Sequence, residues 1–235
     1  MSDDSKSLDL VGLGKVAKAI PPEVYTQTSS TVLSTFDRLV APITETTNGL
    51  GRYIKQKFDN MVEVEKAVAT YTLENAVIKA QNKAKRLNKP TVAPAHSKSF
   101  VKAIEESSKE TDPLLHEMWE NLLAEQLIDN VFHPHFVEIL SHFSSKEAQL
   151  LTKLKAKDQV TDHCGGYISY NDDSFTHWLS NGIGAEMLPW DYSCILLDEF
   201  RFIGLLAPNK EKYPDGTVIL HLSRAGQAFL KSVSP

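Results

Sequence analysis

The chain has 235 residues, 42% of them hydrophobic and 23% charged, which is typical of a globular protein and atypical of a disordered or fibrous one. Its formal net charge of −5 argues against a generally basic nucleic-acid-binding protein. The two cysteines lack metal-type spacing and fit a reducing compartment. Because no apolar run of about 18 residues and no secretory signal pattern is present, we expect a cytoplasmic protein without a transmembrane segment.

Residues 1–22 are predicted to form an N-terminal arm, followed by a helical domain over residues 23–143. Within the arm, residues 8–20 alternate apolar side chains with lysines, so they suit either a helix on a membrane surface, a helix docked on the protein or a flexible arm. The helical domain opens with a helix over about 23–40, which Ala41 and Pro42 are expected to interrupt.

A long helix is predicted from about Leu50 to Leu87, because the segment has no proline and only one glycine. One of its stripes has the spacing of a heptad seam and is our candidate for self-association, which would make a homodimer; the alternative is packing within its own domain. The seam residues are Met61, Val64, Val68, Tyr71, Asn75 and Ile78. A second stripe of small residues would allow another helix to approach closely: Leu73, Ala76, Ala80, Ala84 and Leu87.

The end of this helix and the segment after it are basic. Residues 76–98 contain no acid and six cations: Lys79, Lys83, Lys85, Arg86, Lys89 and Lys98. Such a run is usually a solvated helix end, where cations also suit the helix dipole. The alternative is a surface that meets phosphate or an acidic partner. A further helix is predicted at about 96–108.

The densest apolar stretch runs from Pro113 to Leu140 and is predicted to form a helical hairpin. Asp112 is a suitable N-cap and Pro113 suits the first helical position. One face of the first helix is apolar through Leu115, Met118, Trp119, Leu122, Leu123 and Leu127. His133 and Pro134 then begin the second helix, to which Phe136 contributes an apolar side chain.

This stretch resembles the bacterial abortive-infection alpha (Abi-alpha) family. The matching segments are Glu110–Asp112, Trp119–Leu123, His133–Leu140 and Phe143–Ala148. The motif consists of core-type residues. We expect six of them to form the core of the family motif: Trp119, Leu122, Leu123, His133, Pro134 and Phe136. The resemblance implies a part in defence against bacteriophage and supplies no catalytic residues.

Residues 144–235 are predicted to form a winged-helix-like α+β domain. Ser144 and Glu147 form a capping box, Tyr167–Tyr170 reads as a strand, and Phe175, Trp178 and Leu179 suggest a short helix. A helix over about 191–203 with Gly204 as its stop, strands at 205–207 and 217–222, and a last helix capped by Ser223 complete the pattern. The expected fold class is therefore mostly α, a helical domain followed by this domain.

Three kinds of site are conceivable in these domains: a DNA-binding surface, a metal site and a nucleophile pair. DNA binding needs positive charge, and residues 144–235 carry nine lysines and arginines against eleven acids, a balance of −2 that favours protein contacts. His135, Glu138 and His142 share one helix face and are weak candidates for metal ligands. His163 and Cys164 are adjacent, which suits a nucleophile pair poorly because neighbouring side chains in a strand point apart.

The sequence thus predicts a non-enzymatic protein without a cofactor that acts through contacts with a protein partner it does not identify. The alternatives are a winged-helix DNA-binding regulator and, less favoured, a metal-dependent enzyme. Nucleic acid is disfavoured as a partner but not excluded.

Overall fold

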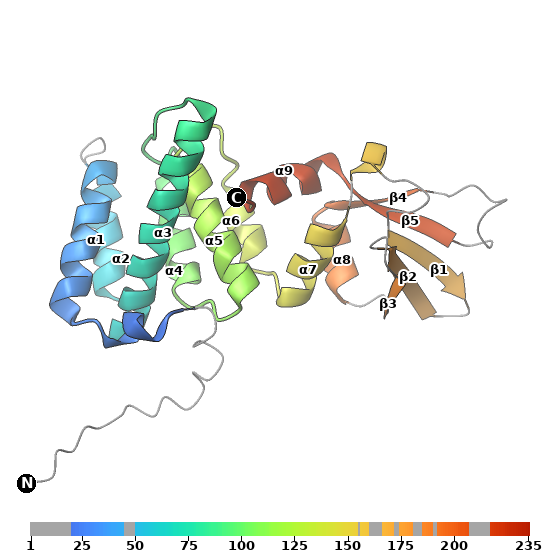
Figure 1. Ribbon diagram of the computed structural model, residues 1–235, viewed down its shortest axis with the longest axis horizontal. Helices are drawn as coiled ribbons and strands as arrows, with labels where there is room; N and C mark the ends of the chain where they lie inside the picture. Colours follow the sequence, from blue (N-terminus) through green and yellow to red (C-terminus); the bar gives the residue numbers. More distant parts are fainter. Residues whose placement is uncertain are drawn as a thin grey trace, which may run out of the picture. The chain divides into compact units, whose positions relative to one another are not determined.

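A computed structural model describes residues 20–44, 50–154, 156–159, 166–171, 174–180, 185–189, 192–206 and 217–235 (Figure 1). The chain is mostly helical, as predicted, and divides into two compact units, residues 1–130 and 131–235. The division falls within the predicted hairpin. Over the described residues, no helix has both the length and the apolar character needed to cross a membrane.

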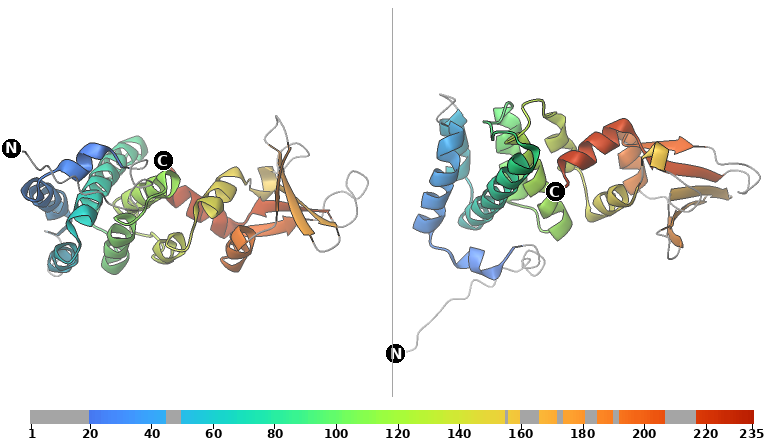
Figure 2. Two further views of the ribbon diagram at one scale, coloured as in Figure 1. Left: turned by 90° about the horizontal axis from the view of Figure 1, so that it is seen from below. Right: turned by 45° about the horizontal axis from the view of Figure 1, so that its top comes forward.

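The first unit is a bundle of helices. In chain order they are η2 (Pro22–Thr26), α1 (Ser29–Thr44), α2 (Leu50–Asp59), α3 (Glu63–Leu87), α4 (Ser97–Ser107) and α5 (Pro113–Gln126). Helix α3 packs against α1 on one side and α5 on the other, as Figures 1 and 2 show, and α4 packs against both α3 and α5. Helix α3 is therefore the element around which this unit is assembled.

Two helix boundaries in this unit differ from the prediction. Helix α1 begins at Ser29 and continues through Ala41 and Pro42; the proline removes one backbone donor, and the helix ends two residues later at Thr44. The predicted long helix is two helices, α2 and α3, separated at Asn60–Val62. The N–H of Met61 donates to the carbonyl of Phe58, and Val62 is extended, so the chain turns where Asp59 and Asn60 favour a turn.

Helix α5 begins as its sequence predicts. The carboxylate of Asp112 accepts hydrogen bonds from the N–H groups of Leu114 and Leu115, and Pro113 occupies the first turn. The predicted apolar face is buried, with Trp119 only 1% exposed. Glu120 and Asn121 are not among the residues of that apolar face, yet both are buried too, because α3 and α4 cover α5 from two sides.

The second unit combines short helices with one antiparallel sheet. Its elements are α6 (His135–Leu140), α7 (Ser145–Lys153), η3 (Lys157–Gln159), β1 (Gly166–Asn171), β2 (Ser174–Ser180), β3 (Ala185–Pro189), α8 (Tyr192–Glu199), β4 (Ile203–Leu206), β5 (Thr217–Leu222) and α9 (Arg224–Ser232). The strands lie in the order β3-β2-β1-β5-β4. The capping box of Ser144 and Glu147 and the Ser223 cap of α9 are both present, as predicted.

Two elements of this unit were predicted wrongly. The segment of Phe175, Trp178 and Leu179 is strand β2, not a helix, because it pairs with β1 on one side and β3 on the other. Helix α8 ends at Glu199, before the predicted stop at Gly204. Arg201 has a φ of 55°, and the N–H of Phe202 bonds back to the carbonyl of Leu197, which releases Ile203 and Gly204 into β4.

Phenylalanine rings form the centre of the second unit. The ring of Phe229 lies 4.8 Å from that of Phe202, and 5.3 Å from those of Phe136 and Phe143, measured between centroids. This cluster joins α6, the start of β4 and α9. Gly226 sits beside it so closely that a Cβ there would lie 2.2 Å from the carbonyl oxygen of Phe202.

Candidate functional site on helix α3

The side of α3 that faces the bundle is lined by small residues. Leu73, Ala76, Ala80 and Ala84 are at most 5% exposed, so this part of the predicted small-residue stripe is buried, whereas Leu87 at its end is 49% exposed. Short side chains bring the backbones of packed helices together. Polar groups on α3 are therefore held within hydrogen-bonding distance of α5.

A buried polar cluster joins the two helices at this level. Oε1 of Glu120 accepts a hydrogen bond of 2.7 Å from Nδ2 of Asn75, while its Oε2 lies 2.7 Å from Nζ of Lys79. His116, one turn earlier on α5, places Nε2 2.9 Å from Oγ1 of Thr72 and Nδ1 3.6 Å from Oε1 of Glu120. His116 and Glu120 are 3% and 7% exposed.

The hydrogen bonds assign the proton on His116. The Thr72 hydroxyl has one hydrogen and donates it to the carbonyl of Val68 at 2.8 Å. It must therefore accept from Nε2–H of His116, which leaves Nδ1 bare and facing Glu120. Burial lowers the pKa of His116; the Glu120 carboxylate opposes this shift and Lys79 adds to it. The imidazole is thus held neutral as a donor to α3.

The lowered pKa of His116 predicts a loss of stability on mild acidification. The unfolded chain takes up this proton first, so unfolding becomes easier as the pH falls below about 6.5, the ordinary histidine value. We expect the free energy of unfolding in urea to fall between about pH 7.5 and 5.5, above the range of the carboxylates. The decrease should be smaller in His116→Gln, which keeps a donor but does not titrate, and an equal decrease in both proteins would contradict this role.

This cluster is not predictable from the sequence pattern alone. The His116–Glu120 pair has i,i+4 spacing on one helix, which was the available signal. Its partners Thr72, Asn75 and Lys79 come from another helix more than forty positions away, and their pairing depends on how the two helices pack.

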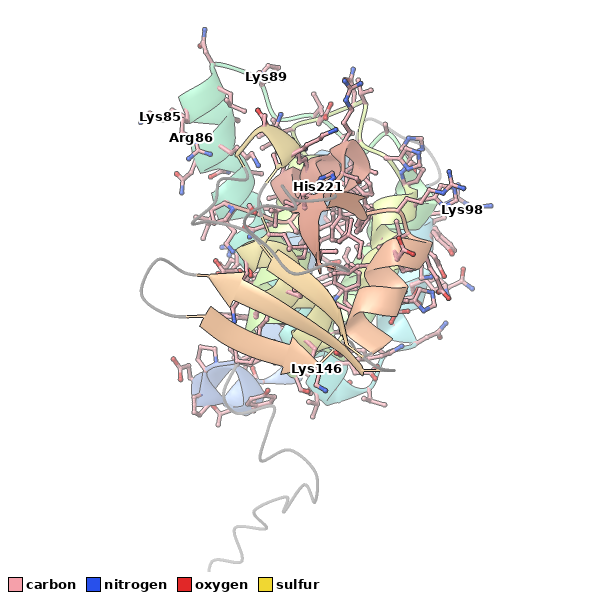
Figure 3. All side chains as sticks on the ribbon, turned by 90° about the vertical axis from the view of Figure 1, so that its right-hand side faces the viewer. Lys85, Arg86, Lys89, Lys98, Lys146 and His221 are labelled. Carbon is pink, nitrogen blue, oxygen red and sulfur yellow. The ribbon has the colours of Figure 1, made fainter. Side chains whose placement is uncertain are left out.

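The cations in the second half of α3 and just after its end fall into two sets. Lys79 and Lys83 point toward α5, where Lys83 lies 2.9 Å from Oε2 of Glu125, so α5 carboxylates neutralise both. Lys85, Arg86 and Lys89 are exposed and form no ion pair with any described residue. Figure 3 shows these three at the end of α3, with Lys98 apart from them across the unit. Positive charge therefore remains uncompensated at one place only among the α3 cations.

The residues of the predicted self-association seam differ in their exposure to solvent. Val68 is buried in the unit and Ile78 is 50% exposed, while the others are partly buried: Met61, Val64, Tyr71 and Asn75. Asn75, expected to set register between chains, donates to Glu120 of its own chain. Met61 lies in the break before α3. Self-association through this seam stays a prediction, which the mass from light scattering would test.

The family-motif residues and the weak metal candidates lie in different environments. Trp119, Leu122 and Leu123 are buried in the first unit. In the second unit, His133 and Pro134 are exposed rather than in the core, and Phe136 is partly buried against Phe229.

The weak metal candidates His135, Glu138 and His142 are all exposed, and Glu138 lies 3.6 Å from His142. Within the described ranges, no three histidine, cysteine, aspartate or glutamate residues form a group suited to a metal ion. His163 and Cys164, like the arm up to residue 19, lie outside the described residues.

A shallow groove of about 360 Å³ opens in the second unit. Half of its lining residues are apolar, and the others are a lysine, a glutamine and two residues with hydroxyl groups. The lining residues are Thr152, Leu154, Ala156, Leu222, Gln227, Leu230, Lys231 and Ser234. Since Lys231 is the only charged residue in this lining, the groove offers no set of charges that would select a ligand, whereas α3 does.

The family model described as abortive infection alpha matches residues 65–220, more than half of the chain. The matched region begins in α3 and includes the polar cluster and the cations of α3. No solved structure matches the chain.

Proposed function

Because this chain belongs to the abortive infection alpha family, we propose that it is a non-enzymatic component of anti-phage defence that acts through contacts with other proteins. The family match carries the defence role. The mode of action is supported by the outer side of α3, where a half-exposed Ile78 lies near three exposed cations that form no ion pair with any described residue. Exposed anchors on a rigid element suit recognition of a protein partner.

We also propose that residues 144–235 form a winged-helix-like domain adapted to protein contacts. The order α7, α8, hairpin β4–β5 and α9 supports this assignment. The departure is the three strands β1–β3 between α7 and α8, where a winged helix would carry its second helix. Because the charge balance of this region is −2, contacts with DNA phosphates are disfavoured. The alternative function, a DNA-binding transcriptional regulator, is therefore less favoured.

Phage challenge tests the defence role. Bacteria that express the chain should form fewer plaques than bacteria with an empty plasmid, because an abortive response stops infected cells from releasing phage. When every cell is infected at once, the culture should collapse rather than survive.

The matched control is Trp119→Ala, which removes a buried core side chain and is expected to destabilise the first unit and to reduce protection. Equal plaque numbers with and without the wild-type chain, across a panel of unrelated phages and with the protein present in the cells, would contradict the proposal.

A further inference from the structure

The outward side of the second half of α3 is exposed over several turns. One helix arc presents Ile78, Gln81, Asn82 and Lys85, and the helix end adds Arg86 and Lys89. We call these six residues the α3 outer face. The face carries three cations, two amides and one large apolar side chain. Glu74 lies one turn before Ile78, and no acid follows until Glu105.

The positive charge of the α3 outer face follows from how α3 packs against α5 and from where the helix ends. The cations on the inner side, Lys79 and Lys83, pair with carboxylates of α5. These carboxylates are thus occupied by the inner lysines and do not neutralise the three outer cations. Asn88, with a φ of 51°, ends the helix, and its N–H bonds to the carbonyls of Ala84 and Lys85. The side chains of Lys85, Arg86 and Lys89 are exposed at this helix end and just beyond it.

We propose that the α3 outer face is a docking surface for an acidic segment of a partner protein, with an apolar side chain of that segment covering Ile78. Three cations without acids among them are complementary to carboxylates. The amides of Gln81 and Asn82 supply donors and acceptors between Ile78 and the cations. This inference rests on the proposed mode of action and names the surface that carries it.

A protein segment fits this face better than nucleic acid or a membrane. Three cations would neutralise about three phosphates, fewer than the 6–10 contacts typical of firm DNA binding. On an anionic membrane each cation contributes about 1 kcal/mol, and Ile78 is half covered already and can insert little further. An acidic protein segment uses both the charge and the remaining apolar area of Ile78.

Fluorescence anisotropy with defined probes tests the proposal. The main probe is a short labelled peptide of glutamate and leucine at helical spacing; the comparison probes are the same peptide with serine for leucine, duplex DNA and vesicles of phosphatidylserine and phosphatidylcholine. We expect the glutamate–leucine peptide to bind most tightly. Tighter binding of DNA or vesicles than of this peptide, or no binding of the peptide, would overturn the proposal.

Matched variants locate the surface. Lys85→Glu should weaken peptide binding about five- to tenfold, because it replaces an attraction of up to about 1 kcal/mol by a repulsion. Lys98→Glu makes the same change at an exposed cation away from the face and should have little effect beyond general charge. Ile78→Ser should weaken binding about fivefold, whereas Leu87→Ser, at the end of the inner side of the helix, should not.

The four substitutions alter exposed or half-exposed side chains, so the proteins should remain folded, which thermal melts would verify. If Lys85→Glu and Lys98→Glu weaken binding equally, the attraction is general and the docking surface is wrong. The phage assay separates the two proposals. Loss of protection in Lys85→Glu alone supports both, whereas peptide binding by a chain that gives no protection removes only the proposed defence role.

Discussion

Replacing Trp119 by alanine should lower the free energy of unfolding of the first unit by about 3–5 kcal/mol, the range for large aromatic truncations in protein cores. Trp119 is 1% exposed on α5, whose neighbours Leu122 and Leu123 are completely buried. A cavity there cannot collapse easily, because α3 and α4 hold α5 from two sides. Urea unfolding followed by circular dichroism measures the change.

Leu87→Ala is the matched control, since it also shortens a large apolar side chain but at a site that is 49% exposed. It should cost less than about 1 kcal/mol. A similarly small loss in Trp119→Ala would mean that Trp119 is not packed in the core, and it would then be a candidate for partner binding.

Gly226→Ala should have the second large effect, a loss of about 3 kcal/mol at the upper end of the range for overpacked cores. The added Cβ would lie 2.2 Å from the carbonyl oxygen of Phe202, and a backbone atom cannot rotate away. Separating α9 from this backbone would also disturb the contact between the rings of Phe202 and Phe229. The loss should appear in the unfolding of the second unit.

Gly204→Ala is the control, for which we expect a much smaller loss of stability. Its Cβ would lie 2.7 Å from Nε2 of His221, a partly exposed ring that can rotate toward solvent. We therefore expect a loss of about 1 kcal/mol, the low end of the same range. Equal losses in the two variants, measured by thermal unfolding, would show that the second unit adjusts its backbone around Gly226.

The features that the sequence predicted correctly are mostly local. The cap of Asp112, the capping box of Ser144 and Glu147, and the cap of Ser223 each depend on residues within three positions, so the pattern alone identifies them. The hairpin β4–β5 was also predicted, from two short apolar runs separated by turn-forming residues.

The errors arose where distant neighbours decide the outcome. Phe175 and Trp178 are large apolar residues at a spacing compatible with a helix, and strand pairing with β1 and β3 determined their structure instead. Glu120 is a charged residue that the pattern placed off the apolar face. Its burial depends on Asn75 and Lys79, which only the packing of α3 on α5 brings close. No periodicity within α5 contains that information.

The small residues of α3 also set the distance across which its lysines form ion pairs with α5. Ala76, Ala80 and Ala84 keep the two helix axes close, and Lys79 and Lys83 reach Glu120 and Glu125 across that short separation. Any residue longer than alanine at these positions would push the helices apart without altering a single charged group. The size of the side chains at these three positions therefore determines whether Lys79 and Lys83 stay paired with carboxylates. It thereby also determines how much positive charge α3 presents to its surroundings.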